Sequence, residues 1–155
     1  MPGTPGIISP MSTGTERTPQ HLTVSAVCFH NAASQVLTVR KSGTTAFMLP
    51  GGKLEPGESP IEAAVREVLE EIGIAITPRD LTALGTFTAA AANEPDTSVS
   101  GHIFCAELTG EPKPAGEIAE LRWYSQSDTS PQLAPLLRDH IFPALRDANP
   151  SRRND

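Results

Sequence analysis

The stretch from residue 52 to residue 74, GKLEPGESPIEAAVREVLEEIGI, constrains the fold of this chain more than any other. It opens with a loop rich in Gly and Pro, and it continues into a helix whose two ends follow from local chemistry. Ser59 is suited to the N-cap, Pro60 to the first helical position, and Glu62 completes a capping box. Gly73 predicts the end of the helix, because glycine readily adopts the left-handed conformation at C′.

The predicted helix has an apolar face and a flank of carboxylates. At about 100° per residue, the apolar face consists of Ile61, Ala64, Val65, Val68, Leu69 and Ile72. Glu67 and Glu71 stack along one flank of this face, and Glu70 lies further round. Glu67 and Glu71 repel each other. The negative end of the helix dipole disfavours each of the three carboxylates by ~0.3–1 kcal/mol. A bound divalent cation would reverse the sign of these terms, since Mg²⁺ prefers carboxylate oxygens.

Taken alone, such a helix also fits an ordinary solvated surface, because glutamate is a good helix former. The loop before the helix favours the metal-binding interpretation over the solvated surface. The whole stretch follows the pattern G-x5-E-x7-REV-x-EE-x-GI, beginning at Gly52, with Glu58 in the loop and Gly73 at the end. This pattern resembles the Nudix box at every defining position, and on these residues the chain resembles a Nudix hydrolase of the small, MutT type.

The resemblance implies an α/β fold: an α/β/α sandwich with a mixed β-sheet, in which the box forms a loop–helix–loop. Apolar, β-branched runs predict the strands. They are expected at residues 22–30, 35–41, 47–52, 81–92, 99–108 and 118–124. The first two are expected to be antiparallel neighbours. Residues 131–148 have helical spacing, with a break or kink at Pro143.

The expected domain covers residues 21–148. Residues 1–20 are rich in Thr, Pro, Gly and Ser without periodicity, which is typical of a disordered tail. Met11 is an alternative start to Met1. Residues 149–155 form a charged C-terminal tail.

The reaction implied by the resemblance is the cleavage of a pyrophosphate bond by water, assisted by Mg²⁺ or, as a substitute, Mn²⁺. Glu67 and Glu71 are the first expected metal ligands. Glu70 is expected to help, and the carbonyl of Gly51 is a further candidate. Glu58 is expected either near the metal or as a brace for the loop.

The expected catalytic residues are Glu67, Glu70, Arg66 and Glu117. Arg66 would orient Glu67 or Glu70 through a charge-assisted hydrogen bond. Glu117 lies in a segment similar to the one that supplies a further carboxylate in MutT-type proteins, and Glu94 is its alternative. The choice of general base among these glutamates stays open.

The expected substrate contacts are Arg40, Lys53, Gly52 and Glu94. Lys41 is a further candidate for the phosphates, although the basic residues are also compatible with an exposed surface without a role. The leading substrate is a nucleoside triphosphate or a modified nucleotide. A nucleotide sugar is the first alternative, and a non-catalytic nucleotide-binding regulator with the same fold is the second. The proline and the tyrosine that mark two other Nudix subgroups are absent from residues 86–92.

Composition narrows the partners of this chain. A net charge of -6 over 155 residues argues against binding to a nucleic-acid polymer, whose partners have basic surfaces. No apolar run reaches transmembrane length, so we expect a soluble cytoplasmic protein, monomeric or homodimeric, with no membrane partner. Cys28 and Cys105 lie in apolar strand-like runs without metal-ligand spacing, which indicates buried free thiols.

Overall fold

A single mixed sheet organises the described part of the chain. The computed structural model describes residues 18–92 and 94–148. Its strands are β2 (Gln20–His30), β3 (Gln35–Lys41), β4 (Gly51–Lys53), β5 (Thr82–Ala90), β6 (Thr97–Glu107) and β7 (Ile118–Ser125). They lie in the order β5-β6-β2-β3-β7, and β4 pairs with β2. β2 and β6 run parallel, whereas the other named pairs are antiparallel, so the predicted mixed sheet is confirmed.

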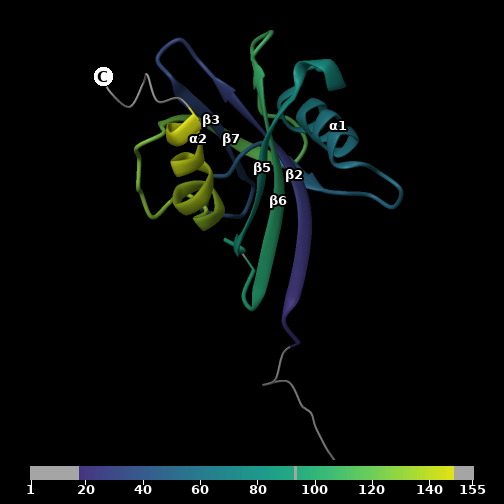
Figure 1. The fold of residues 1–155 in the computed structure, drawn as a ribbon, viewed down its shortest axis with the longest axis vertical. Coiled ribbons are helices and arrows are strands. Elements are labelled where there is room, and N and C mark those ends of the chain that lie inside the picture. The colour runs from purple at the N-terminus through teal and green to yellow at the C-terminus, as the bar shows by residue number, and fades with distance from the viewer. Residues whose placement is uncertain (1–17, 93, 149–155) are drawn as a thin grey trace, which may run out of the picture.

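Helices cover both faces of this sheet, as Figure 1 shows. Helix α1 (Pro60–Ile72) lies on one side, and a short 3-10 helix, η2 (Pro78–Asp80), follows it. The wide π turn η3 (Leu137–Ile141) and helix α2 (Phe142–Ala148) lie on the other side. The predicted α/β/α sandwich is therefore confirmed.

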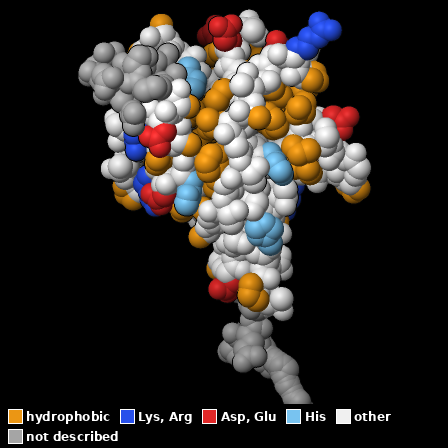
Figure 2. Space-filling view, viewed as in Figure 1, with side chains coloured by type: hydrophobic (Ala, Val, Ile, Leu, Met, Phe, Trp, Pro, Cys, Tyr) orange, Lys and Arg blue, Asp and Glu red, His pale blue; other side chains and the backbone are white. Residues whose placement is uncertain are grey.

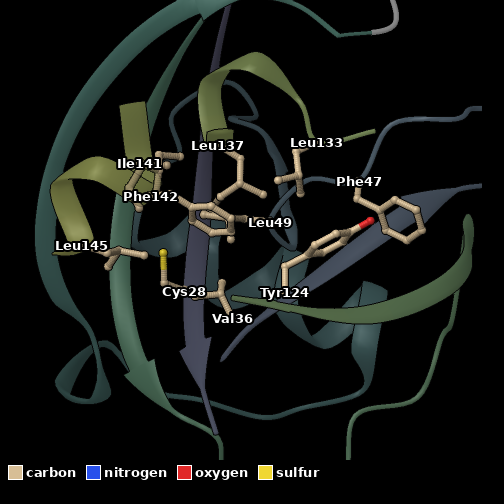
Figure 3. Packing of buried hydrophobic residues seen from close by; sticks show 12 residues of the cluster. Cys28, Val36, Phe47, Leu49, Tyr124, Leu133, Leu137, Ile141, Phe142 and Leu145 are labelled. Atoms are coloured by element: carbon tan, nitrogen blue, oxygen red, sulfur yellow. The ribbon is translucent and has the colours of Figure 1, made fainter. Parts of the chain in front are cut away.

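The central strand β2 contributes side chains to both halves of the core. Successive residues of a strand point to opposite faces. Val27 and Phe29 accordingly pack in the cluster under α1, whereas Ala26 and Cys28 pack in the cluster under α2. Figure 3 shows the second cluster, in which Phe142 lies over the sheet. β2 is thus buried on both faces where it passes between the helices.

Helix α1 has the predicted ends. The backbone N–H of Glu62 donates to Oγ of Ser59 at 3.1 Å, and the N–H of Ser59 donates to Oε1 of Glu62 at 2.9 Å. Gly73 has a φ of 71° and donates to the carbonyl of Leu69 at 3.1 Å. These contacts satisfy backbone groups that a bare helix end leaves unpaired.

Most of the predicted apolar face of α1 packs on the sheet. Ala64, Val68 and Ile72 lie in the cluster under the helix, and Ile61 and Val65 pack against it. Leu69, expected on the same face, is instead 54% exposed. Ala63 and Glu71 are buried in addition.

The predicted strand at residues 47–52 needs correction, and the predicted break or kink at Pro143 takes a specific form. The predicted strand at residues 47–52 is not continuous, because Phe47 and Met48 form only isolated bridges and the strand begins at Gly51. Pro50 lacks the N–H that a continuous ladder requires. In the last helix, the N–H of Phe142 bonds to the carbonyl of Leu137, five residues back. This wide turn directly precedes Pro143, whose ring clashes with an ordinary α-helical turn.

The predicted N-terminal boundary of the domain lies inside the described residues, whereas the predicted C-terminal boundary coincides with their end at residue 148. β2 begins at Gln20, one residue before the expected start of the domain. Residues 1–17 and 149–155, where the tails were predicted, lie outside the described residues, so both tails stay predictions. Among the helices that the structure describes, none is long and apolar enough to cross a membrane.

The cluster under α2 predicts a large stability effect at Phe142, which has no exposed surface. Replacing Phe142 with Ala should lower the free energy of unfolding by about 3–5 kcal/mol, because it removes buried area and leaves a cavity. Replacing the exposed Leu69 with Ala is the matched control and should change it by less than about 0.5 kcal/mol. Urea denaturation measures both. Equal losses in the two variants would contradict this account of the core.

Candidate active site

Arg66 holds the loop before α1 against the helix. Its Nε donates to Oε2 of Glu58 at 2.7 Å, and its Nη2 donates to Oε1 of Glu58 at 2.8 Å. Nη2 also donates to the carbonyl of Lys53 at 3.1 Å. Glu58 in turn accepts the backbone N–H of Glu55 at 2.8 Å. The Arg66 bonds, together with this N–H, lower the pKa of Glu58 to about 2. In this structure Glu58 braces the loop.

The same guanidinium reaches the helix carboxylates. Nη1 of Arg66 donates to Oε2 of Glu67 at 2.9 Å and, less closely, to Oε1 of Glu70 at 3.4 Å. The side chain of Glu67 is 15% exposed, whereas that of Glu70 is 56% exposed. Arg66 therefore positions Glu67 more firmly than Glu70, and Glu70 lies at the outer rim of the site.

Two glycines allow the loop to lie directly on the helix and on β2. A Cβ added to Gly52 would lie 2.5 Å from the carboxylate carbon of Glu67, and one added to Gly51 would lie 2.1 Å from the carbonyl oxygen of Ser25. A side chain at position 51 would clash with the backbone of β2, and one at position 52 would displace the carboxylate of Glu67. The backbone of this turn thus comes into direct contact with a catalytic candidate, Glu67.

Glu71 is the most enclosed carboxylate of the helix, at 7% exposure. Its Oε1 accepts the backbone N–H of Gly51 at 3.0 Å. Burial raises the pKa of Glu71 to about 7 despite that hydrogen bond, and the charges of Glu67 and Glu117 add to the rise while Lys41 opposes it. An ionised Glu71 is therefore costly in the protein without a cation.

Glu117 reaches the site because the segment before it caps the end of α1. The N–H of Lys113 donates to the carbonyl of Ile72 at 3.1 Å, and the N–H of Ala115 donates to the carbonyl of Glu71 at 2.9 Å. Helix carbonyls at this end have no partner within the helix. The capping segment then leads into β7, and it leaves the charge of Glu117 close enough to affect Glu71.

A cleft of about 370 Å³ opens beside the Gly51–Gly52 turn. Most of its lining is aliphatic, and the described charged residues on it are Lys41, Lys53 and Glu94. The other lining residues are Leu22, Val24, Ser25, Ala26, Thr44, Met48, Leu49, Gly51, Gly52, Ala90, Ala91, Ala92, Val99, Ile103, Ala134, Leu136, Leu137 and Ile141. The structure therefore places the glutamates of α1 beside an apolar cleft whose lining includes two lysines and one further carboxylate.

Arg40 takes a different position from the other expected substrate contacts. Its Nε donates to Oε1 of Glu120 at 3.1 Å, and its Nη1 donates to the carbonyl of Thr44 at 2.9 Å. It is not among the described residues that line the cleft. Its strand neighbour Lys41 lines the cleft instead.

Comparisons with known proteins agree with this geometry. The model of the NUDIX domain matches residues 19–145. The chain belongs to the Nudix family. It is 35% identical over 99 residues to a Bacillus subtilis protein provisionally named an 8-oxo-dGTP diphosphatase, covering 61% of this chain and 60% of that protein. It is 34% identical over 103 residues to an ADP-ribose pyrophosphatase of Methanocaldococcus jannaschii, covering 61% of this chain and 57% of that protein.

A solved structure supports the same fold. The MutT protein of Methanosarcina mazei Go1 superposes with a TM-score of 0.70 at 22% identity, covering 86% of this chain and 99% of that one. The two curated relatives, by contrast, are matched over only about three-fifths of their length. The activities given in the names of these two relatives are therefore stated of those proteins alone.

Nudix proteins generally depend on a divalent metal, for which the carboxylates of α1 are the candidate ligands. No group of three or more His, Cys, Asp or Glu among the described residues is arranged as a ready-made metal site. The chemistry of the site nevertheless suits a cation. Glu71 carries mutual repulsion from Glu67 and Glu117 at a buried position, and a divalent ion would convert that repulsion into attraction.

Sequence reasoning missed one residue of this Nudix site. The basic residues Arg40, Lys41 and Lys53 are all phosphate candidates from the sequence, and the structure places Lys41 and Lys53, but not Arg40, on the cleft lining. Ser25, on the cleft floor, has a buried Oγ without a hydrogen-bond partner in the described structure. Its only sequence signal is a small polar residue within an apolar run.

The raised pKa of Glu71 predicts how stability depends on pH in the metal-free protein. An unfolded glutamate titrates near 4.3, so the wild type should lose stability as the pH rises from about 4.3 to about 7. Glu71→Gln removes this titration and keeps an oxygen acceptor for the N–H of Gly51. The variant should be more stable than wild type at pH 8, by on the order of 1–3 kcal/mol, with little difference at pH 4.3.

Urea denaturation in the presence of a chelator measures this effect. Glu70→Gln, at the exposed rim, is the matched control. It retains Glu71, so its stability should follow that of the wild type at both pH values. A Glu71→Gln variant that is less stable than wild type at pH 8 would show that ionised Glu71 has a stabilising partner beyond Gly51.

Proposed function

We propose that the protein is a Mg²⁺-dependent Nudix hydrolase that cleaves a pyrophosphate bond in a nucleoside diphosphate linked to another group. The leading substrate is a nucleoside triphosphate or a modified nucleotide. The observation that supports this proposal most directly is the contact between the Gly51–Gly52 turn and both parts of the site. The turn lies against Glu67 and Glu71 on one side and lines the apolar cleft on the other.

Glu67 and Glu71 are the proposed metal ligands, with Glu70 and the Gly51 carbonyl as further candidates. When bound, Mg²⁺ would neutralise phosphate charge and lower the pKa of an attacking water. Arg66 acts as a positioning residue, since it holds Glu67 and, through Glu58, the loop. Glu117 is the proposed carboxylate from outside the helix, because its charge already reaches Glu71.

The cleft offers different chemistry at different points of its lining. Lys41 and Lys53 provide cations for the phosphates, and the backbone of Gly52 lies beside them. The aliphatic lining suits a nucleoside, which gains from burial of its apolar surface. Glu94 is the remaining charged contact on the described lining and suits a donor group of the substrate.

A nucleoside diphosphate linked to a sugar is the second candidate. It is favoured by the 34% identity to the ADP-ribose pyrophosphatase of Methanocaldococcus jannaschii. A regulator that binds nucleotide without hydrolysing it is the third possibility considered. The full carboxylate set and its position beside the cleft support the catalytic proposal over it.

A substrate panel tests the reaction and its substrate together. Nucleoside triphosphates, an oxidised nucleotide and ADP-ribose should be incubated with and without Mg²⁺, and release of phosphate or pyrophosphate measured. We expect Mg²⁺-dependent turnover of at least one nucleotide and a loss of 10²-fold or more in kcat for Glu67→Gln. Ser127→Ala, on the turn after β7, is the matched control and should retain activity. Nucleotide binding without turnover of any substrate would overturn the enzymatic proposal.

A paired substitution tests which strand residue meets the phosphates. Lys41→Ala should raise KM by roughly 10-fold or more, since a charge-assisted contact is worth ~1.5–3 kcal/mol. Arg40→Ala should change KM by less than about two-fold, because its guanidinium is bonded to Glu120 and Thr44. Steady-state kinetics on the best substrate of the panel measures both. An equal rise in KM for Arg40→Ala would restore the predicted contact of Arg40 with substrate.

A further inference from the structure

The two cysteines of the chain are direct neighbours across two parallel strands. Cys28 of β2 and Cys105 of β6 are Cα partners in the parallel register. Neighbouring strands lie about 4.7–4.9 Å apart, and disulfides form between Cα atoms roughly 4.4–6.8 Å apart. The Cys105 side chain packs against the core cluster that contains Cys28, and each thiol shifts the pKa of the other. Their backbone spacing thus suits a disulfide, and both are free thiols in this structure.

The two thiols differ in their access to solvent. Cys28 has no exposed surface. Figure 3 shows its sulfur in the core under α2, near Leu145. Cys105 is partly exposed and lines a surface depression of about 470 Å³ with Asp80, Thr82 and Glu107. Contact with Cys28 lowers the pKa of Cys105, and the same contact, together with burial, raises that of Cys28. Cys105 is therefore both the reachable thiol and the more readily ionised one.

This pair lies next to the floor of the substrate cleft. Ala26 and Ile103 are Cα partners one pair earlier on the same face of the two strands, and both line the cleft. Two residues along a strand return to the same face. A covalent bond between Cys28 and Cys105 would therefore tie β2 to β6 directly beside that floor.

We propose that Cys28 and Cys105 form a reversible oxidation site for small peroxides, in which Cys105 reacts first and Cys28 completes a disulfide. The thiolate of Cys105 attacks one peroxide oxygen, which leaves Cys105 as a sulfenic acid and releases hydroxide. The sulfur of Cys28 then attacks the sulfur of Cys105 and displaces the second hydroxide. In balance, two thiols and one hydrogen peroxide give one disulfide and two waters. Neither thiol takes part in the proposed hydrolysis, so this site is independent of that function.

Treatment of the folded, full-length protein with hydrogen peroxide tests the proposal. A peptide map made without reducing agent should show one intramolecular bond between Cys28 and Cys105, lost on treatment with dithiothreitol. Recovery of Cys105 as a sulfinic acid, with Cys28 still a free thiol, would overturn the proposal. A disulfide that joins two chains would overturn it as well.

Single substitutions test the order of reaction. In Cys28→Ala the sulfenic acid has no internal partner, so Cys105 should be trapped by dimedone after peroxide treatment. In Cys105→Ala the buried Cys28 should react at least about 10-fold more slowly than Cys105 does in the wild type. Equal peroxide reactivity of Cys28 in Cys105→Ala would show that Cys105 is not the first thiol to react. The wild-type peptide map decides the proposal if either variant fails to fold.

Discussion

The close approach of the Gly51–Gly52 backbone to its surroundings is the constraint on which the site depends. A Cβ at Gly51 would overlap the backbone of Ser25, and a Cβ at Gly52 would overlap the carboxylate of Glu67. Because both positions lack side chains, one turn of chain touches the central strand and the helix at once. This contact places the helix carboxylates at the mouth of the cleft.

That arrangement brings together charges that the protein alone does not balance. Arg66 neutralises Glu58 and bonds to Glu67, but within the described structure it forms no ion pair with Glu71. The buried Glu71 instead receives one backbone N–H and the repulsion of two other carboxylates. Burying an ionised carboxylate without a matching charge is costly. The site therefore gives up stability at a position where a bound divalent ion would recover it.

Strand β2 connects the functional elements that the sequence places far apart. Ser25 and Ala26 line the cleft, and Cys28 pairs with Cys105. The end of the edge strand β5, at Ala90, and the two residues after it contribute another wall of the cleft. On the face seen in Figure 2, an uncharged surface runs along the middle of the molecule, while acidic and basic side chains gather mainly at its margins. The parallel pairing of β2 with β6 makes this arrangement possible, since it sets residues 26–28 beside residues 103–105.

Local chemistry was enough to predict α1 and its caps. The capping box and Gly73 act within a few residues of each other, so they can be read without knowledge of the fold. The spacing of Glu58, Arg66 and the helix glutamates carried the resemblance to the Nudix box, and that resemblance implied the mixed sheet and the family. The register of the strands and the burial of Glu71 depend on packing between distant segments, and no local pattern encodes them.

The sequence by itself therefore determined the chemistry that residues 52–74 can perform, because the relevant groups share one loop and one helix. Only the tertiary structure decided that Lys41, rather than Arg40, lines the cleft, since the guanidinium of Arg40 is held by Glu120 and Thr44. Only the tertiary structure decided that Glu71 is buried and that Cys28 meets Cys105. Burial and cross-strand pairing are properties of the packed sheet, and they arise from contacts between segments that are separate in the sequence.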